Sequence, residues 1–311
     1  MRAPRKRKLA SSRRRPVAWC IAAAVSCVLG AAALSGAGTA RAAETGAAGA
    51  SGTVEVWPTD ANAQALLDRT LRNLYEGDFV QVFRLESQRA RGRSMTRRLQ
   101  VVRKESEQPG RAVLRFLSPE DIRGSAMLVI ERDGQPDDVF LYLPATLRTR
   151  RISLAQRYDS FFGTNLTYED LEPKYGVDFE ARITGRGEVA GVPCLELQIR
   201  PRPDVESQYD ETRSCVDPER DVALRTDYYV SGRLIKRLVV EPSTLSHLDG
   251  RWVAGRARLE STATDFTTDI TSELYERKTS IPDRLFSTWN LESGSDASDL
   301  RVLRSGDEGG D

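Results

Sequence analysis

The chain has 311 residues, of which 46 are basic, 45 are acidic and one is histidine, so its formal net charge is only +1. Residues 1–42 hold nine basic and no acidic residues, which leaves 37 basic and 45 acidic residues, a charge of −8, in residues 43–311. Because nucleic-acid-binding domains are usually basic, this acidic remainder argues against nucleic acid as a partner. A charged fraction of 29% also excludes a protein that crosses a membrane with many helices.

The N-terminal segment has the three parts of an export signal. Its basic run ends at Arg15, apolar or small residues fill Val17–Leu34, and Ala40-Arg41-Ala42 matches a cleavage site. We therefore predict that residues 1–42 are a cleavable signal peptide and that the protein is exported. An uncleaved, membrane-anchored form is the alternative, because the apolar run is longer than a minimal signal requires.

The remaining chain divides into three predicted parts. Residues 43–58 are rich in Ala, Gly and Ser, which is typical of a flexible leader. Residues 59–291 carry the periodic hydrophobic pattern of one folded domain. Residues 292–311 are rich in Gly, Ser and Asp, and we expect a disordered acidic tail there.

The first predicted element is a helix over residues 60–76, which Gly77 ends. Leu67, Leu71 and Leu74 recur at helical spacing, so one face of this helix is apolar. The pattern predicts a helix that packs on a sheet.

Beyond this helix the hydrophobic period changes to two, which indicates strands. Such segments run from Phe79 to about Ile152 and resume over residues 177–277, at the short spacing of an antiparallel sheet, and we estimate about eleven strands. Residues 153–175 lack the alternation and are rich in aromatic residues. Because helices do not alternate with strands, the fold class is mainly β with helices (α+β), not a doubly wound nucleotide-binding fold.

Two cysteines, Cys194 and Cys215, remain beyond the predicted signal. A hairpin centred between Asp204 and Val205 would place them directly opposite each other, within reach of a disulfide after modest adjustment. Because exported proteins fold in an oxidising compartment, we predict a Cys194–Cys215 disulfide. Two buried free thiols are the alternative. Without a C-x-x-C motif, the bond would be a structural cross-link.

Residue patterns for catalysis are missing from the sequence. The single histidine, His247, is predicted to be a surface loop residue, and no G-x-S-x-G motif or zinc-ligand spacing accompanies it. The carboxylate pairs Asp137-Asp138 and Glu169-Asp170 are interpreted as solvated turn charges. We therefore predict no catalytic residue, no metal, no cofactor and no enzymatic activity. An envelope hydrolase with two distant carboxylates and a transmembrane outer-membrane β-barrel are the alternatives.

Several runs over about residues 60–291 together resemble the outer-membrane lipoprotein-sorting family, the LolA-like proteins, as a divergent subgroup. They are Pro119, Gly124-Ser125-Ala126, Phe140-Leu141-Tyr142-Leu143-Pro144, Arg148, Arg150-Arg151-Ile152, Ser160-Phe161-Phe162-Gly163-Thr164, Tyr168-Glu169-Asp170-Leu171, Gly191-Val192-Pro193-Cys194, Val216-Asp217, Tyr228-Tyr229-Val230-Ser231-Gly232 and Lys236. The resemblance implies an unclosed antiparallel β-barrel of about eleven strands, with a helical lid over its concave face. Cys215 stands where the family usually has an aromatic residue before Val-Asp.

The resemblance also implies a function: a periplasmic, monomeric carrier that binds acyl chains of lipoproteins or lipids in an apolar cavity and passes them to a membrane partner without covalent catalysis. A transporter of the resistance-nodulation-division type is a candidate partner. The candidate lipid-binding residues are Leu114, Phe116, Leu128, Ile130, Phe140, Tyr142, Phe161, Phe162 and Tyr168. Arg150 and Arg151 are candidates for contact with a head group or partner, with solvated strand charge as the other interpretation. Ordinary core packing is the alternative for each apolar residue.

Overall fold

The computed structural model describes residues 60–105, 109–132 and 135–293. The predicted signal peptide (1–42), the predicted leader (43–58) and residues 294–311 of the predicted tail lie outside the described residues, so those expectations stay predictions. Two compact units divide the chain after Glu55, and the description concerns the second of them.

Helix α1 (Ala61–Tyr75) confirms the predicted first element. Asp60 caps this helix, because its carboxylate accepts hydrogen bonds from backbone N–H groups of the first turn. Its buried side chains are Ala63, Leu66, Leu67 and Thr70. The apolar stripe is thus rotated from the predicted one: Leu67 is buried, but Leu74 is 56% exposed.

The described residues form fifteen strands. In chain order they are β1 (Phe79–Arg89), β2 (Met95–Lys104), β3 (Arg111–Ser118), β4 (Ala126–Ile130), β5 (Asp138–Leu143), β6 (Arg148–Arg151), β7 (Phe179–Val189), β8 (Val192–Pro201), β9 (Glu211–Asp217), β10 (Val222–Val230), β11 (Arg233–Val240), β12 (Leu245–Leu248), β13 (Arg251–Ala254), β14 (Arg256–Ser261) and β15 (Phe266–Arg277). The estimate of about eleven was too low, because the main sheet alone has thirteen.

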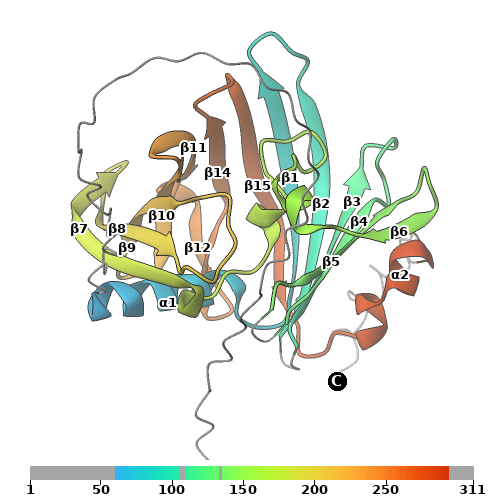
Figure 1. Ribbon diagram of the computed structural model, residues 1–311, viewed down its shortest axis with the longest axis horizontal. Helices are drawn as coiled ribbons and strands as arrows, with labels where there is room; N and C mark the ends of the chain where they lie inside the picture. The colour runs from blue at the N-terminus through green and yellow to red at the C-terminus, as the bar shows by residue number, and fades with distance from the viewer. Residues whose placement is uncertain (1–59, 106–108, 133–134, 294–311) are drawn as a thin grey trace, which may run out of the picture. The chain divides into compact units, whose positions relative to one another are not determined.

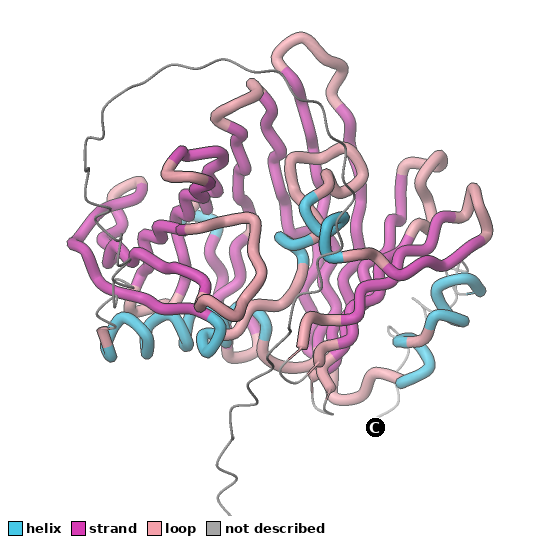
Figure 2. The backbone as a smooth tube through the Cα atoms, in the orientation of Figure 1, coloured by secondary structure: helices cyan, strands magenta, loops and turns pink. Residues whose placement is uncertain are grey.

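The main sheet is antiparallel and unclosed. Its order is β6-β5-β4-β3-β2-β1-β15-β14-β11-β10-β9-β8-β7 (Figures 1 and 2). Strands β1 to β6 follow one another as a meander, and the last long strand, β15, pairs with β1 and joins the two halves. Strands β6 and β7 are the two edges.

The predicted irregular aromatic segment connects these two edge strands. It contains three short 3₁₀ helices, η1 (Leu154–Tyr158), η2 (Glu169–Leu171) and η3 (Gly176–Asp178), and contributes no strand to the main sheet. We call residues 153–178 the insert. Figure 1 shows it, in yellow-green, in front of the middle of the curved sheet.

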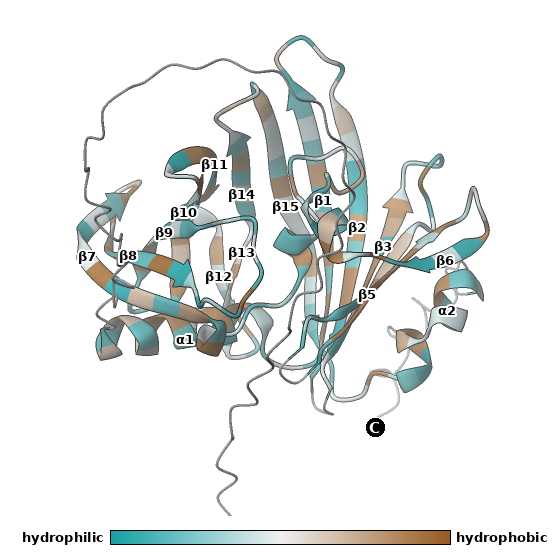
Figure 3. Cartoon of the chain, in the orientation of Figure 1, coloured by the Kyte–Doolittle hydropathy of each residue, from teal (hydrophilic) through white to brown (hydrophobic). Residues whose placement is uncertain are grey.

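Successive side chains along each strand point to opposite faces of the sheet, and the cross-strand registers show which residues share a face. Figure 3 shows mixed apolar and polar bands along several strands. Followed from β1 through β15, β14, β11, β10 and β9 to β8, the registers place Leu85 and Leu197 on the same face. We call it the inner face. Helix α1 packs on it over β7 to β9, and the insert packs on it over β1 to β6. The cover of the inner face is therefore only partly helical.

The opposite, outer face has two covers of its own. Over β1 to β5 lies the C-terminal segment, residues 281–293, which contains the 3₁₀ helix η5 (Asp283–Phe286) and helix α2 (Thr288–Ser293). Over β8 to β11 lies the hairpin of β12 and β13, reached through the 3₁₀ helix η4 (Pro242–Thr244). This hairpin was not predicted. His247, expected in a loop, is on β12 and contacts Trp252 with 5.2 Å between the centroids of the two tilted rings.

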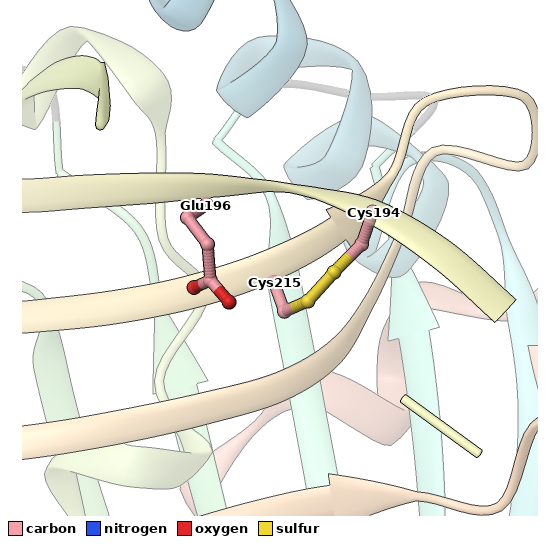
Figure 4. A group of neighbouring side chains, drawn as sticks. All are labelled: Cys194, Glu196 and Cys215. Carbon is pink, nitrogen blue, oxygen red and sulfur yellow. A yellow bond between two sulfur atoms is a disulfide. The ribbon is translucent and has the colours of Figure 1, made fainter. Parts of the chain in front are cut away.

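The predicted disulfide between Cys194 and Cys215 is present, with 5.4 Å between the two Cα atoms. The predicted register is wrong, however. Glu196, not Cys194, lies directly opposite Cys215, and the two cysteines are diagonal neighbours on the outer face (Figure 4). The disulfide therefore cross-links the two expected strands, β8 and β9, but between diagonal neighbours and not between directly opposed residues.

Candidate functional site

The middle of the insert is a tight turn that docks on the inner face. An isolated bridge joins Ser160 to Thr167, and Phe162 and Gly163 at its tip adopt positive φ angles of 47° and 71°. The side-chain amide of Asn165 donates hydrogen bonds of 2.9 and 3.0 Å to the carbonyls of Leu259 and Phe266. These bonds attach the turn to strands β14 and β15.

Four aromatic rings meet where this turn contacts the sheet. Phe116 of β3 lies 5.2 Å from Phe161 and 4.7 Å from Phe162 between ring centroids, and Phe161 lies 5.5 Å from Tyr168. We call the three of these residues that belong to the insert, Phe161, Phe162 and Tyr168, the aromatic plug; Phe116 is the ring of the sheet on which they pack. Each such pair contributes about 0.5–1.5 kcal/mol beyond its buried area. Since Phe116 and Phe161 are each 1% exposed, the plug fills the centre of the inner face with the chain's own side chains.

The nine predicted lipid-binding residues do not share one face. Five of them, Leu114, Phe116, Phe161, Phe162 and Tyr168, belong to the inner-face cluster. The other four, Leu128, Ile130, Phe140 and Tyr142, contact the C-terminal segment on the outer face. The register explains the division: Leu128 lies opposite Val113, the neighbour of Leu114, and not opposite Leu114 itself. Sequence periodicity gives the alternation along each strand but not the phase between strands.

Sequence reasoning missed the inner-face residues of β4 and β5, which are Met127, Val129, Val139 and Leu141. Along these two strands they alternate with the four predicted residues, and each of them is at most 2% exposed. Because both alternations of these central strands are apolar, only the cross-strand register distinguishes them.

The two predicted contact arginines lie on opposite faces of the edge strand β6. Arg151 pairs with Asp138 and lies opposite Phe140, on the outer face. Arg150 lies opposite Leu141, on the inner face; it is exposed and forms no ion pair among the described residues. Asp138 is 4% exposed and also binds Arg132, so the interpretation of this carboxylate as a solvated turn charge is wrong.

A buried ion pair holds the insert to the other half of the sheet. The Lys236 ammonium of β11 pairs with the Asp170 carboxylate of η2, and both side chains are 6% exposed. The Tyr209 hydroxyl donates to Asp170 at 2.8 Å, and the Lys236 Nζ lies 4.9 and 5.0 Å from the ring centroids of Tyr209 and Tyr228. Burial lowers the pKa of Lys236, while the neighbouring Asp170 opposes that change.

Other acidic residues of the insert are also buried and partnered. Glu169, 2% exposed, accepts hydrogen bonds from the Ser207 hydroxyl at 2.6 Å and from the Gln208 side chain at 2.9 Å. Glu172, 1% exposed, pairs with Arg157 within the insert. The Glu169-Asp170 pair is therefore not the solvated turn charge that its sequence indicated. An isolated acidic dipeptide carries no signal of its partners, which come from β11 and the loop after β8.

One group of side chains has the composition of a metal site. The Cys194 and Cys215 sulfurs and a Glu196 carboxylate oxygen lie within 4.8 Å of one another (Figure 4). The two sulfurs are bonded to each other, and Glu196 accepts a 2.7 Å hydrogen bond from Arg225. This group therefore acts as a cross-link with an ion pair beside it.

A pocket of about 310 Å³ opens at the ends of β1, β14 and β15. Its lining includes Arg89, Asp265 and Phe266, and the Arg89 guanidinium stacks 4.3 Å from the centroid of the Phe266 ring. None of the helices among the described residues is long and apolar enough to span a membrane.

The fold places the molecule in a known structural class. A domain described as an outer-membrane lipoprotein-sorting protein from Vibrio parahaemolyticus matches with a TM-score of 0.67 and 22% identity, covering 74% of this chain and 98% of its own. A LolA superfamily protein from Nitrosomonas europaea matches with a TM-score of 0.59 and 18% identity, covering 75% of this chain and 99% of its own. The fold is thus that of the LolA-like proteins, which confirms the resemblance seen in the sequence.

A DUF1329 family protein from Desulfovibrio piger has a TM-score of 0.69 and 26% identity, covering 73% of this chain and 97% of its own. A family model described as "uncharacterized protein" matches residues 109–293, more than half of the chain, and the chain belongs to that family. No curated protein matches the sequence.

Proposed function

We propose that the protein is a periplasmic carrier that binds acyl chains of lipids or lipoproteins on its inner face and passes them to a membrane partner. One observation carries the proposal. In a LolA-like fold, the apolar inner face of a large sheet is covered by a segment, the insert, that is not part of the sheet and touches it with aromatic side chains.

Binding would exchange one apolar occupant for another. Each CH₂ group of an acyl chain moved out of water contributes about 0.8 kcal/mol, so a long chain offsets the loss of the aromatic contacts made by Phe161 and Phe162. The exchange needs no covalent step. Transfer then requires only a partner whose apolar site takes the chain as the plug returns to the inner face.

The receiving partner that we propose is a membrane transporter of the resistance-nodulation-division type, as the family resemblance implies, and the carrier is proposed to act as a monomer. Arg150 is the more favourable of the two predicted contact residues, because it is exposed at an edge of the inner face. Arg151 instead lies on the outer face, in an ion pair.

The test is mass spectrometry of small molecules that co-purify with the protein from the cell envelope, combined with titration of a fluorescent fatty acid. We expect bound acyl lipid and saturable binding. The matched control is Leu128→Ala, which changes the outer face and should leave binding unchanged. A protein that carries no lipid and binds no fatty acid would contradict the proposal.

A further inference from the structure

An unpaired arginine lies under the tip of the insert. Arg97 of β2 is opposite Leu85 in the register, on the inner face, and is 7% exposed. Its Nε and Nη1 atoms are buried without a hydrogen-bond partner among the described residues. Its one hydrogen bond there is a 3.6 Å contact from Nη2 to the Met95 sulfur, a weak acceptor.

Such a group is energetically unfavourable and calls for an explanation, because a buried charge without a partner loses its hydration and gains nothing in return. Asp121, a carboxylate that acts electrostatically on Arg97, is an exposed loop residue and forms no ion pair with it among the described residues. Burial lowers the pKa of Arg97, but a guanidinium stays protonated at any physiological pH. The site therefore offers a positive charge with free donors.

The insert, which covers the apolar inner face, also covers the Arg97 guanidinium. A Cβ placed on Gly163 would lie 3.4 Å from Nη2 of Arg97, so the insert tip lies beside the guanidinium, with room for little more than the glycine hydrogen between them. Phe161 and Phe162, the two residues before Gly163, belong to the aromatic plug. A movement that removes the plug from the sheet would therefore also uncover Arg97.

From Arg97 the inner face continues as an apolar surface. Leu99, two residues further along β2, lies opposite Phe116, and beyond it follow Met127 on β4 and Leu141 on β5. A positive charge at one end of a long apolar surface fits an amphiphile with an anionic head and an acyl tail.

We propose that Arg97 binds the anionic head group, a carboxylate or a phosphate, of an acyl ligand whose tail replaces the aromatic plug. The proposal rests on the proposed carrier function. It assigns a polarity to the site, with the head at β2 under Gly163 and the tail across β3 to β5, and it makes anionic amphiphiles the preferred ligand class.

The experiment compares two ligands with the same acyl tail, palmitate with a charged carboxylate and methyl palmitate with a neutral ester, in competition with a fluorescent fatty acid on the purified exported protein. Since a hydrogen bond to a charged group contributes more than a neutral one, we expect palmitate to bind roughly tenfold tighter or more. Arg97→Met should abolish this preference and leave methyl palmitate binding unchanged. Arg97→Lys should keep part of it.

The matched control is Arg98→Met, which removes the same charge one residue away on the other face, where Arg98 pairs with Glu273 at 2.7 Å. It should retain the preference. Equal affinity of the wild-type protein for the two ligands would overturn the head-group proposal alone. Inorganic phosphate that binds as tightly as palmitate would also overturn it, by showing a free-anion site. If neither palmitate nor methyl palmitate bound, the carrier function itself would be overturned.

Discussion

The two faces of the same strands are covered in physically different ways. The insert on the inner face is held by its aromatic plug and, in addition, by buried polar contacts, chiefly the Asp170–Lys236 pair with both side chains 6% exposed. The C-terminal segment on the outer face is held by buried apolar residues such as Leu285 and Leu291. Its ion pairs from Lys104 and Arg111 both end on Asp283, which is 56% exposed, so solvent screens them more than it screens the Asp170–Lys236 pair.

This difference matters for a protein proposed to open on one face only. Apolar packing is lost in proportion to the area separated, whereas a buried ion pair loses much of its energy as soon as one partner leaves. The inner cover should therefore respond to changes of charge, and the outer cover to changes of side-chain volume.

Asp170→Ala should have the largest effect, because it leaves the Lys236 ammonium buried without its counter-charge. We expect the free energy of unfolding to fall by about 3–5 kcal/mol, measured by urea denaturation. The double variant Asp170→Ala with Lys236→Met should recover much of the loss, since the unpaired charge is then gone. A double variant as unstable as the single one would show that the charge of Lys236 is not the cause.

Leu291→Ala tests the outer cover. Leu291 is fully buried in α2, so we expect a loss of about 2–5 kcal/mol in unfolding free energy, with fatty-acid affinity unchanged. Trp289→Ala is the matched control, because Trp289 is in the same helix but is 71% exposed, and it should change stability little. A fall in ligand affinity with Leu291→Ala would remove the distinction between the two covers.

Phe162→Ala sharpens the comparison from the inner side. Phe162 is only partly buried, so its loss should destabilise the protein by about 1–2 kcal/mol, less than a fully buried phenylalanine. The same change removes part of the plug that an acyl chain must displace, and fatty-acid affinity should rise. Calorimetry and fluorescence titration measure the two effects. Decreased affinity would mean that Phe162 contacts the ligand and does not compete with it.

The sequence predicted the strands well because alternation and turn residues are local signals. The register between strands was predicted less well, because it depends on contacts between residues far apart in the sequence. The loop between β8 and β9 is fixed by Tyr209, 5% exposed, and by hydrogen bonds of Gln208 to Glu169 of the distant insert. In the pairing of β8 and β9 that goes with this loop, Glu196 and not Cys194 lies opposite Cys215. Motif resemblance identified the fold, but it could not supply this detail.

The same limit divided the candidate site. Phe161, Phe162 and Tyr168 were correctly placed together because they are close in sequence and the segment lacks alternation. Leu128 and Tyr142 were grouped with them although they lie on the outer face, since each strand offers two apolar alternations. Arg97 carried no signal at all, because a basic residue on a strand usually faces water. Only its burial and the lack of hydrogen-bond partners for Nε and Nη1 within the described part of the chain distinguish it.

The smallest expected effect concerns pH at the β4–β5 turn. Burial raises the pKa of Asp137 to about 6, and the nearby Glu172 and Glu131 carboxylates add to this. The folded state therefore binds a proton that the unfolded state releases near pH 4. The stabilising contribution is fully present below about pH 4 and is lost as the pH rises to about 6. We expect Asp137→Asn to flatten this dependence and to raise the melting temperature at pH 7.

Melting curves between pH 4 and pH 7 measure this effect, and Asp204→Asn, at an exposed turn, is the matched control for loss of one negative charge. Because Glu172 belongs to the insert and Asp137 does not, the carboxyl repulsion between them acts only while the inner cover is in place. A bound acyl ligand that displaces the insert should therefore reduce the difference between wild type and Asp137→Asn at pH 7. An equal difference with and without ligand would mean that the end of the insert near Glu172 stays in place when the tip moves.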